Sequence, residues 1–257
     1  MGQPSISRGP VFEDLQEKVV VVTGAARGIG RRVAEAFGAA GSKVLAADLS
    51  EEVLGLTGPD PGPGRWINQR CDVSDQESVA AMVERCLLDL GPPDVLLNIA
   101  AISQPRQVMD MSLKHWQRTI ETNLNSVFIC TKAFLPHMVQ RQAGSVISFS
   151  SLVAATGGHT SAHYAAAKAG VEGFTRSLAL EVGGYGVRVN TVAPGMVETM
   201  MLALMPGPQQ ERLVARTPLR RCGRPDDFVG VCMLLASDAG SYITGQTIHV
   251  NGGLYMN

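Results

Sequence analysis

The sequence is poor in charged residues and lacks a long apolar run. Only 18% of its 257 residues are charged, against about 25% in an average globular protein, and the net charge is -1. So balanced a charge gives no reason to expect nucleic acid or an anionic membrane surface as a partner. No segment approaches the roughly 20 apolar residues of a membrane span, and the N-terminal extension, residues 1–16, has no apolar run typical of a signal peptide. We expect a cytoplasmic protein, and the low charge favours an oligomer.

Cysteine is too scattered for a disulfide framework or a metal site. The five cysteines form no CxxC pair and no cluster with histidine, and their number is odd. They are Cys71, Cys86, Cys130, Cys222 and Cys232. We interpret them as buried or idle thiols in a reducing compartment, and we expect no metal ion.

Short apolar runs alternate with helical stretches along almost the whole chain. Strands are predicted at 18–24, 43–48, 66–71, 94–100, 145–151, 187–195 and 246–253. Helices are predicted at 29–41, 75–91, 112–142, 161–182 and 225–237, with irregular segments at 55–65 and 196–221. Parallel strands need such helical crossovers. The pattern predicts an α/β fold, a single doubly wound, Rossmann-type parallel sheet of about seven strands with helices on both faces, in one domain over residues 1–257.

The motif TGAARGIG joins the first predicted strand to the first predicted helix. Its glycines permit a tight turn and let the backbone approach a ligand, and the N-terminus of the following helix stabilises a pyrophosphate. The alternative is an ordinary glycine-rich turn, but the strand before it and the helix after it favour a nucleotide site. We therefore predict that Gly24, Arg27, Gly28, Ile29 and Gly30 bind a dinucleotide.

Asp48 ends the second predicted strand, 18 residues after Gly30. An acid at this place can bind both hydroxyls of the adenosine ribose of NAD, and it repels the extra phosphate of NADP. Two observations argue against this interpretation of Asp48. Arg27 could bind the extra phosphate of NADP, and the aspartate could instead be a turn or N-cap residue. Since one arginine hardly offsets a carboxylate that faces a phosphate, we predict NAD, with NADP less favoured. Asp72 and Val73, after the third strand, are predicted to lie under the adenine.

Tyr164 and Lys168 stand four residues apart in YAAAK, so their side chains point the same way along a helix. The plain alternative is an aromatic ring stacked on a lysine stem. A phenol exchanges protons near neutral pH only if its pKa falls by about 3 units, which needs about 4 kcal/mol. An ammonium about 4 Å away contributes about that much at an effective dielectric constant of about 20. The spacing thus predicts that Lys168 lowers the pKa of Tyr164 beside a hydride-accepting cofactor.

The motifs TGAARGIG, NIAA, TNLNSVF, SS at 150–151, YAAAK and APGMVET follow one another in the order typical of the short-chain dehydrogenase/reductase family, which the chain resembles over about residues 17–253. The resemblance implies that Tyr164 is the general acid/base and that Lys168 also holds the nicotinamide ribose. It implies that Ser151 orients the substrate oxygen, with Ser150 structural. It also implies that the backbone of Asn123 anchors a water of the proton relay, although this asparagine could also stabilise a helix kink.

The resemblance implies further contacts to the cofactor. They involve Asn98, Ala100, Pro194, Gly195, Val197 and Thr199. The stretch that begins at Asn98 departs from the family's Asn-Asn-Ala-Gly, because Ile99 replaces the second asparagine and Ala101 replaces the glycine. We expect a small change of packing there and no loss of binding.

The predicted activity is an NAD-dependent interconversion of a secondary alcohol and a ketone. The substrate cleft is predicted to gather Ser103, Gln104, residues 153–157, His159, His163 and a lid at 196–221. The methionines of the lid favour a moderately apolar substrate, although they could equally be core. The family is commonly tetrameric, so a homotetramer or a dimer is expected. Alternatives are an NADP-dependent 3-oxoacyl reductase and a non-catalytic dinucleotide sensor, whereas a methyltransferase would need no Tyr-Lys pair.

Overall fold

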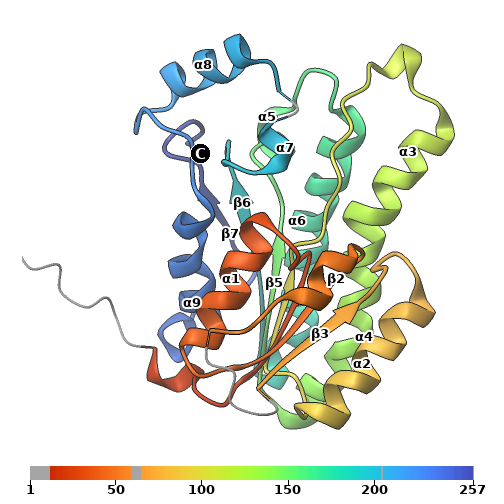
Figure 1. Ribbon diagram of the computed structural model, residues 1–257, viewed down its shortest axis with the longest axis vertical. Helices are drawn as coiled ribbons and strands as arrows, with labels where there is room; N and C mark the ends of the chain where they lie inside the picture. The colour runs from red at the N-terminus through yellow and green to blue at the C-terminus, as the bar shows by residue number, and fades with distance from the viewer. Residues whose placement is uncertain (1–11, 60–64, 204, 257) are drawn as a thin grey trace, which may run out of the picture.

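The fold is built on one parallel sheet of seven strands. The computed structural model describes residues 12–59, 65–203 and 205–256. Within them the strands are β1 (Val19–Thr23), β2 (Lys43–Asp48), β3 (Trp66–Arg70), β4 (Val95–Asn98), β5 (Gly144–Phe149), β6 (Val187–Pro194) and β7 (Thr247–Val250). They lie in the order β3-β2-β1-β4-β5-β6-β7, and every neighbouring pair is parallel (Figure 1). The predicted doubly wound α/β fold is confirmed.

Helices cover both faces of the sheet, which explains why its strands read as continuous apolar runs. On one face, α1 (Gly28–Ala39) and α9 (Val229–Ala236) pack over a core that includes Val20 and Val22 of β1. On the other face, α2 (Gln76–Asp89), α4 (Ser126–Arg141) and α6 (Ala162–Val182) pack over a core that includes Val19 and Val21. Successive β1 residues thus alternate between the two cores.

The carboxyl ends of β1 and β4 mark the place where the strand order reverses. From β1 the chain proceeds to β2 and β3 on one side, whereas β4 to β7 lie on the other. In open α/β sheets, ligands bind at such a switch point. The glycine motif follows β1 and the NIAA stretch follows β4, so the two meet here. The short helices α5 (Val153–Thr156), α7 (Met200–Ala203) and α8 (Gly207–Arg216) lie above this edge (Figure 1).

The structure differs from the predicted elements at two long segments. The stretch 112–142 is not one regular helix, because α3 (Leu113–Ile120) and α4 are joined by a π-helical turn, Glu121–Asn125. The turn contains Asn123, whose side chain bonds to the backbone of Ile102. The segment 196–221 is also more regular than predicted, since it contains α7 and α8.

The N-terminal extension is described only in part. Residues 1–11 of the predicted extension lie outside the described part of the chain, but Leu15 at its end is fully buried in the core under α1. No helix in the described ranges is long and apolar enough to cross a membrane.

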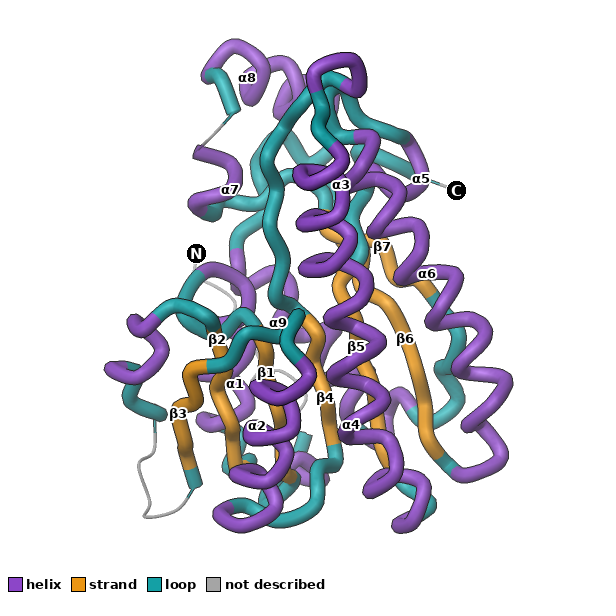
Figure 2. The backbone as a smooth tube through the Cα atoms, turned by 90° about the vertical axis from the view of Figure 1, so that its right-hand side faces the viewer, coloured by secondary structure: helices purple, strands orange, loops and turns teal. Residues whose placement is uncertain are grey.

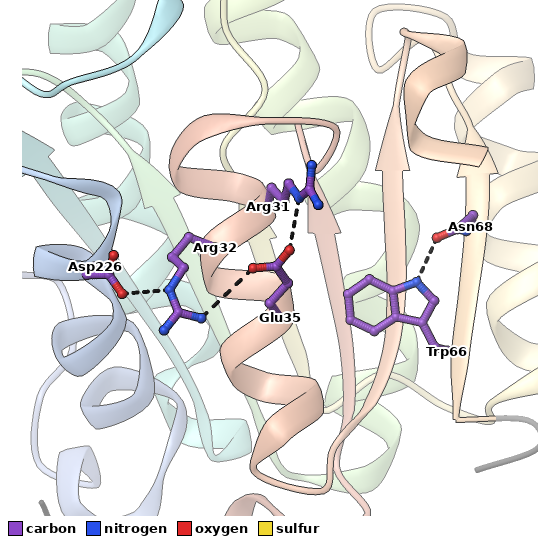
Figure 3. Close-up of polar contacts among 6 residues, drawn as sticks. All are labelled: Arg31, Arg32, Glu35, Trp66, Asn68 and Asp226. Atoms are coloured by element: carbon purple, nitrogen blue, oxygen red, sulfur yellow. Dashed lines mark hydrogen bonds and ion pairs between the residues drawn. The ribbon is translucent and has the colours of Figure 1, made fainter. Parts of the chain in front are cut away.

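Polar side chains tie the surface of α1 to the turn before α9. Nε of Arg31 donates to Glu35 at 2.9 Å, and Nε of Arg32 donates to Asp226 at 2.6 Å (Figure 3). On β3, the indole of Trp66 donates to Asn68 at 2.7 Å. The ion pairs are largely exposed, so each contributes at most about 1 kcal/mol. The fold therefore depends on its two apolar cores.

A methyl group at Gly30 should unfold the start of α1. A Cβ there would lie 2.1 Å from the carbonyl oxygen of Gly24. We expect Gly30→Ala to lower the free energy of unfolding by about 2–4 kcal/mol in urea titration, because backbone must move. The matched control is Gly230→Ala in α9, where no atom lies within 4 Å of the added Cβ, and which should gain up to about 1 kcal/mol. Equal stability of the two variants would contradict the packing of this loop.

Candidate active site

The loop after β1 is pressed against the segment after β4. Gly24 has a φ of +72°, and a Cβ on it would lie 2.7 Å from the backbone nitrogen of Ala100. A Cβ on Gly28 would lie 3.3 Å from Cγ2 of Thr199, which places the exit of β6 beside the start of α1. The N-cap of α1, Arg27, makes no side-chain capping bond, so the first amides of the helix are available to a ligand. Uncapped helix amides next to glycines, where no side chain intrudes, fit the pyrophosphate of a dinucleotide.

Asp48 stands at the carboxyl end of β2 and reaches the glycine loop. Its Oδ2 accepts a hydrogen bond from the amide of Ala26 at 3.0 Å, and its Oδ1 accepts one from the amide of Ser50 at 2.9 Å. Two backbone donors thus fix the carboxylate beside the loop. Arg27 is exposed and, among the described residues, forms no ion pair, although its Nη1 lies 3.0 Å from the sulfur of Met200.

The side chains of Asp72 and Asn98, both predicted to contact the cofactor, are engaged by hydrogen bonds within the protein. Asp72 is engaged by its own turn, because its Oδ1 accepts from the amide and the hydroxyl of Ser74, and Val73 is buried. The Asn98 side chain points into the protein, where its Nδ2 donates to the hydroxyls of Thr131 and Ser148. Only the backbone at Asn98 can therefore line the cofactor cleft.

The stretch that departs from the family's Asn-Asn-Ala-Gly packs against both cores. Ile99 is half-buried against the core under α1, and Ala100 packs against the core on the opposite face. The Thr23 hydroxyl accepts hydrogen bonds from the amides of Ile99 and Ala100, at 3.1 and 3.4 Å. Thr23 thus holds the backbone of this stretch, and the expected effect of the departure on packing and binding stays a prediction.

The chemistry-bearing side chains of α6 lie beside the end of β5. Lys168 is 2% exposed, and its Nζ donates to the carbonyl oxygen of Phe149 at 2.7 Å. The same Nζ lies 5.7 Å from the centroid of the Tyr164 ring. The Ser151 hydroxyl, two residues after β5, is within hydrogen-bonding reach of the Tyr164 phenol. The sequence-predicted trio is thus brought together.

In the polypeptide alone the pKa of Tyr164 is raised, and the lowering predicted beside a bound cofactor stays a prediction. Burial raises the pKa of Tyr164 to about 12, and the hydrogen bond with Ser151 opposes this only in part. Burial also lowers the pKa of Lys168 to about 8. The physical reason is desolvation, which disfavours the charged form of each group, and the Lys168 ammonium also donates to the Phe149 carbonyl.

Asn123 and Ser150 have visible structural roles. The Asn123 amide is completely buried, accepts from the Ile102 N–H and donates to the Ile102 carbonyl, both at 3.0 Å. This bond pair accounts for the helix kink, and the relay role of Asn123 stays a prediction. The Ser150 hydroxyl lies 2.7 Å from a carboxylate oxygen of Glu172 and 3.1 Å from the carbonyl of Lys168, so it ties β5 to α6.

The exit of β6 closes the cleft from the other side. The Gly195 amide donates to the Val250 carbonyl at 3.1 Å, which holds the Pro194–Gly195 turn against β7. Val197 is buried and forms a bridge with Gly223. Thr199 then leads directly into α7 and α8, the candidate lid.

Sequence reasoning missed one residue of the cleft wall. His163, predicted as a possible substrate contact, is 1% exposed and its Nε2 contacts the Gln104 carbonyl at 3.0 Å. His115 of α3 contacts the same oxygen at 3.1 Å. No spacing or motif signals this meeting, because the two histidines are 48 positions apart.

A surface hollow of about 380 Å³ lies between residues 106–109 and residues 158–162. It is lined by Arg106, Gln107, Val108, Met109, Gly158, His159, Thr160 and Ala162. In the described ranges, no group of three or more His, Cys, Asp or Glu side chains could hold a metal ion.

Comparison with known proteins matches almost the whole chain. A family model described as enoyl-(acyl carrier protein) reductase matches residues 24–255. The 3-oxoacyl-[acyl-carrier-protein] reductase FabG of Escherichia coli is 39% identical over 243 residues, covering 95% of this chain and 99% of the relative. Its counterpart from Pseudomonas aeruginosa is 41% identical over 245 residues, with the same coverage. A short-chain dehydrogenase/reductase crystal structure from Brucella melitensis, titled glucose/ribitol dehydrogenase, has a TM-score of 0.88 and 34% identity, covering 96% of this chain and 99% of that chain.

The buried ammonium should make stability rise with pH. The Lys168 pKa falls from an ordinary 10.5 to about 8, so between these values the unfolded chain holds a proton that the folded chain has released. We expect the free energy of unfolding to rise by about 2 kcal/mol between about pH 7.5 and 9.5 relative to Lys168→Met, at 1.36 kcal/mol per pKa unit. The control is Lys114→Met, an exposed lysine, which should keep the wild-type slope. Parallel profiles for wild type and Lys168→Met in denaturant titrations would contradict the desolvation of this group.

Proposed function

Because the chain belongs to the short-chain dehydrogenase/reductase family and is an oxidoreductase of that family, we propose that it interconverts a secondary alcohol and a ketone with NAD(H). The observation that carries the proposal is the meeting of Tyr164, Ser151 and Lys168 beside the strand-order switch point. A non-catalytic dinucleotide sensor would not need these three side chains gathered at one place, so the geometry favours an enzyme.

Each residue of the trio has a role in the proposed reaction. A bound nicotinamide dinucleotide would supply the carbon that accepts or donates the hydride. Ser151 donates a hydrogen bond to the substrate oxygen, and Tyr164 takes the alcohol proton or returns it to the ketone oxygen. Lys168 favours the phenolate electrostatically, and its contact with the Phe149 carbonyl holds it at the base of the cleft. Since the pKa of Tyr164 is about 12 in the polypeptide alone, where burial outweighs the Ser151 hydrogen bond, proton transfer needs a further positive charge, which an oxidised nicotinamide ring would carry.

The proposed preference for NAD rests on Asp48. Its carboxylate is held at the glycine loop by the amides of Ala26 and Ser50, so it cannot swing away from an incoming ribose. A ribose with free hydroxyls can donate to the carboxylate, whereas a 2′-phosphate would meet a fixed like charge.

A second candidate is the reduction of a 3-oxoacyl thioester with NADPH. The relatives named 3-oxoacyl-[acyl-carrier-protein] reductase, at 39% and 41% identity, favour it. The exposed guanidinium of Arg27 beside the glycine loop could bind a 2′-phosphate. The homo-oligomer stays a prediction, which the exposed apolar side chains Phe128 on α4 and Leu180 on α6 support.

Replacing the Tyr164 phenol should abolish turnover but not cofactor binding. We expect Tyr164→Phe to lower kcat by at least about 10²-fold, because proton transfer is lost, while the NADH affinity measured by fluorescence titration changes less than about twofold. The assay panel contains cyclic and aromatic secondary alcohols with NAD, and acetoacetyl-coenzyme A with NADH or NADPH. Tyr185→Phe, which alters a tyrosine beyond the end of α6, is the control and should keep wild-type rates. Turnover retained in Tyr164→Phe would refute the proposed acid/base role.

Removing the charge of Asp48 should shift cofactor choice. Wild type should bind NADH more tightly than NADPH, and Asp48→Asn should move the ratio of affinities toward NADPH by at least about tenfold, or about 1.4 kcal/mol. The asparagine keeps a carbonyl oxygen for one of the two backbone amides. Asp226→Asn, an exposed acid away from the loop, should leave the ratio unchanged. A wild type that already prefers NADPH would overturn the NAD assignment and favour the second candidate.

A further inference from the structure

Residues 99–107 leave β4 and rise as an extended loop toward α3 (Figure 2). Two backbone anchors, four residues apart, hold the loop. Ile102 is bound through its N–H and its carbonyl by the Asn123 side chain. The Arg106 amide donates to the Thr160 carbonyl at 2.8 Å. The loop is therefore fixed to the π-helical turn below and to the segment before α6 above.

The carbonyl between these two anchors is held by two histidines. His163 of α6 and His115 of α3 both place Nε2 on the Gln104 oxygen, at 3.0 and 3.1 Å, with ring centroids 5.1 Å apart. A carbonyl oxygen only accepts, and it has two lone pairs, so both rings donate and both bonds can form together. One atom of the loop is thus tied to two helices at once.

The tautomer of His163 is fixed by its surroundings. Donation from Nε2 leaves Nδ1 as an acceptor, and this Nδ1 is buried without a hydrogen-bond partner among the described residues. Burial lowers the pKa of His163, and this outweighs the hydrogen bond to Gln104, which favours the charged ring. A buried polar atom left unpaired is rare, which indicates that the donated bond on the opposite nitrogen outweighs its loss.

The segment that receives the upper anchor is itself strained. Thr160 has a φ of +60°, a conformation that a β-branched residue rarely adopts. Its carbonyl is the acceptor for the Arg106 amide. Strain of this kind persists where surrounding contacts determine the backbone, and it gathers at functional sites. The loop and the segment before α6 are therefore joined by the hydrogen bond between Arg106 and Thr160.

We propose that His163 and His115 are positioning residues that hold residues 99–107 against α6 through the Gln104 carbonyl and so fix the cleft wall beside Tyr164. His163 directly precedes Tyr164, so a loop tied to His163 keeps a constant position relative to the phenol. The two donors are partly redundant, because either one alone still satisfies the carbonyl. The part that concerns substrate rests on the proposed function.

The test compares single and double replacements. His163→Leu and His115→Leu should each raise hydrogen–deuterium exchange of peptides covering residues 101–107 by about two- to fivefold, and the double variant by at least about tenfold beyond the product of the singles, since only it leaves the carbonyl without a donor. His163→Gln, which offers a donor at nearly the same place as Nε2, should restore wild-type exchange. His137→Leu, on α4, is the matched control.

Kinetics add a readout that general destabilisation would not produce. With NADH and acetoacetyl-coenzyme A, or with the panel alcohol that wild type oxidises fastest, the double variant should raise the substrate KM at least about tenfold while NADH affinity stays within about twofold. A wild type without turnover would refute the proposed function but leave the exchange result to decide the positioning role. That role is overturned if the double variant exchanges like wild type, if His163→Gln fails as His163→Leu does, or if NADH affinity falls in parallel with KM. Should the buried His163→Leu not fold, His163→Phe replaces it in both the single and the double variant, because the phenyl ring fills the place of the imidazole and offers no donor.

Discussion

The site depends on one buried cation and the carbonyl that receives it. Lys168 lies inside the protein at 2% exposure, and its hydrogen bond to Phe149 joins α6 to the last residue of β5. A buried ammonium is tolerated only when it is paired or hydrogen-bonded. That bond fixes the helix that carries Tyr164 relative to the strand end that carries Ser151. The Ser150 hydroxyl, held by Glu172 and the Lys168 carbonyl, makes a second tie between the same two elements.

Topology then brings the cofactor half of the site to the same edge. Parallel strands deliver their carboxyl ends together, so the loops after β1, β2 and β4 meet although they are separated in sequence. Contact between them involves backbone in each case. Gly24 lies against Ala100, and Asp48 is bonded to the amide of Ala26. Substitution at these positions would change the path of the chain as well as the ligand contacts.

Much of this arrangement could be predicted from the sequence, because its signals are local. The run 43–48 forms a strand with the predicted bounds, and the glycine and YAAAK motifs are placed as their spacing indicates. The direction of the Tyr164 pKa shift could not be predicted, since desolvation depends on the atoms packed around the phenol. The π-helical turn follows from a bond between Asn123 and Ile102, and the meeting of His115 with His163 needs the full tertiary fold. No local pattern encodes such contacts.

The two halves of the cleft are built from different kinds of contact, and this has a consequence for specificity. The cofactor half relies on close backbone approach at Gly24 and Gly30, which few substitutions could preserve. The proposed substrate half is built from side chains carried by loops and helices, such as the His115–His163 pair that holds the Gln104 carbonyl. Side chains of that kind can change without moving the sheet. Relatives that share about two-fifths of their residues can therefore keep such backbone contacts in common while side chains on the loops differ, and the His115–His163 pair lies among those side chains.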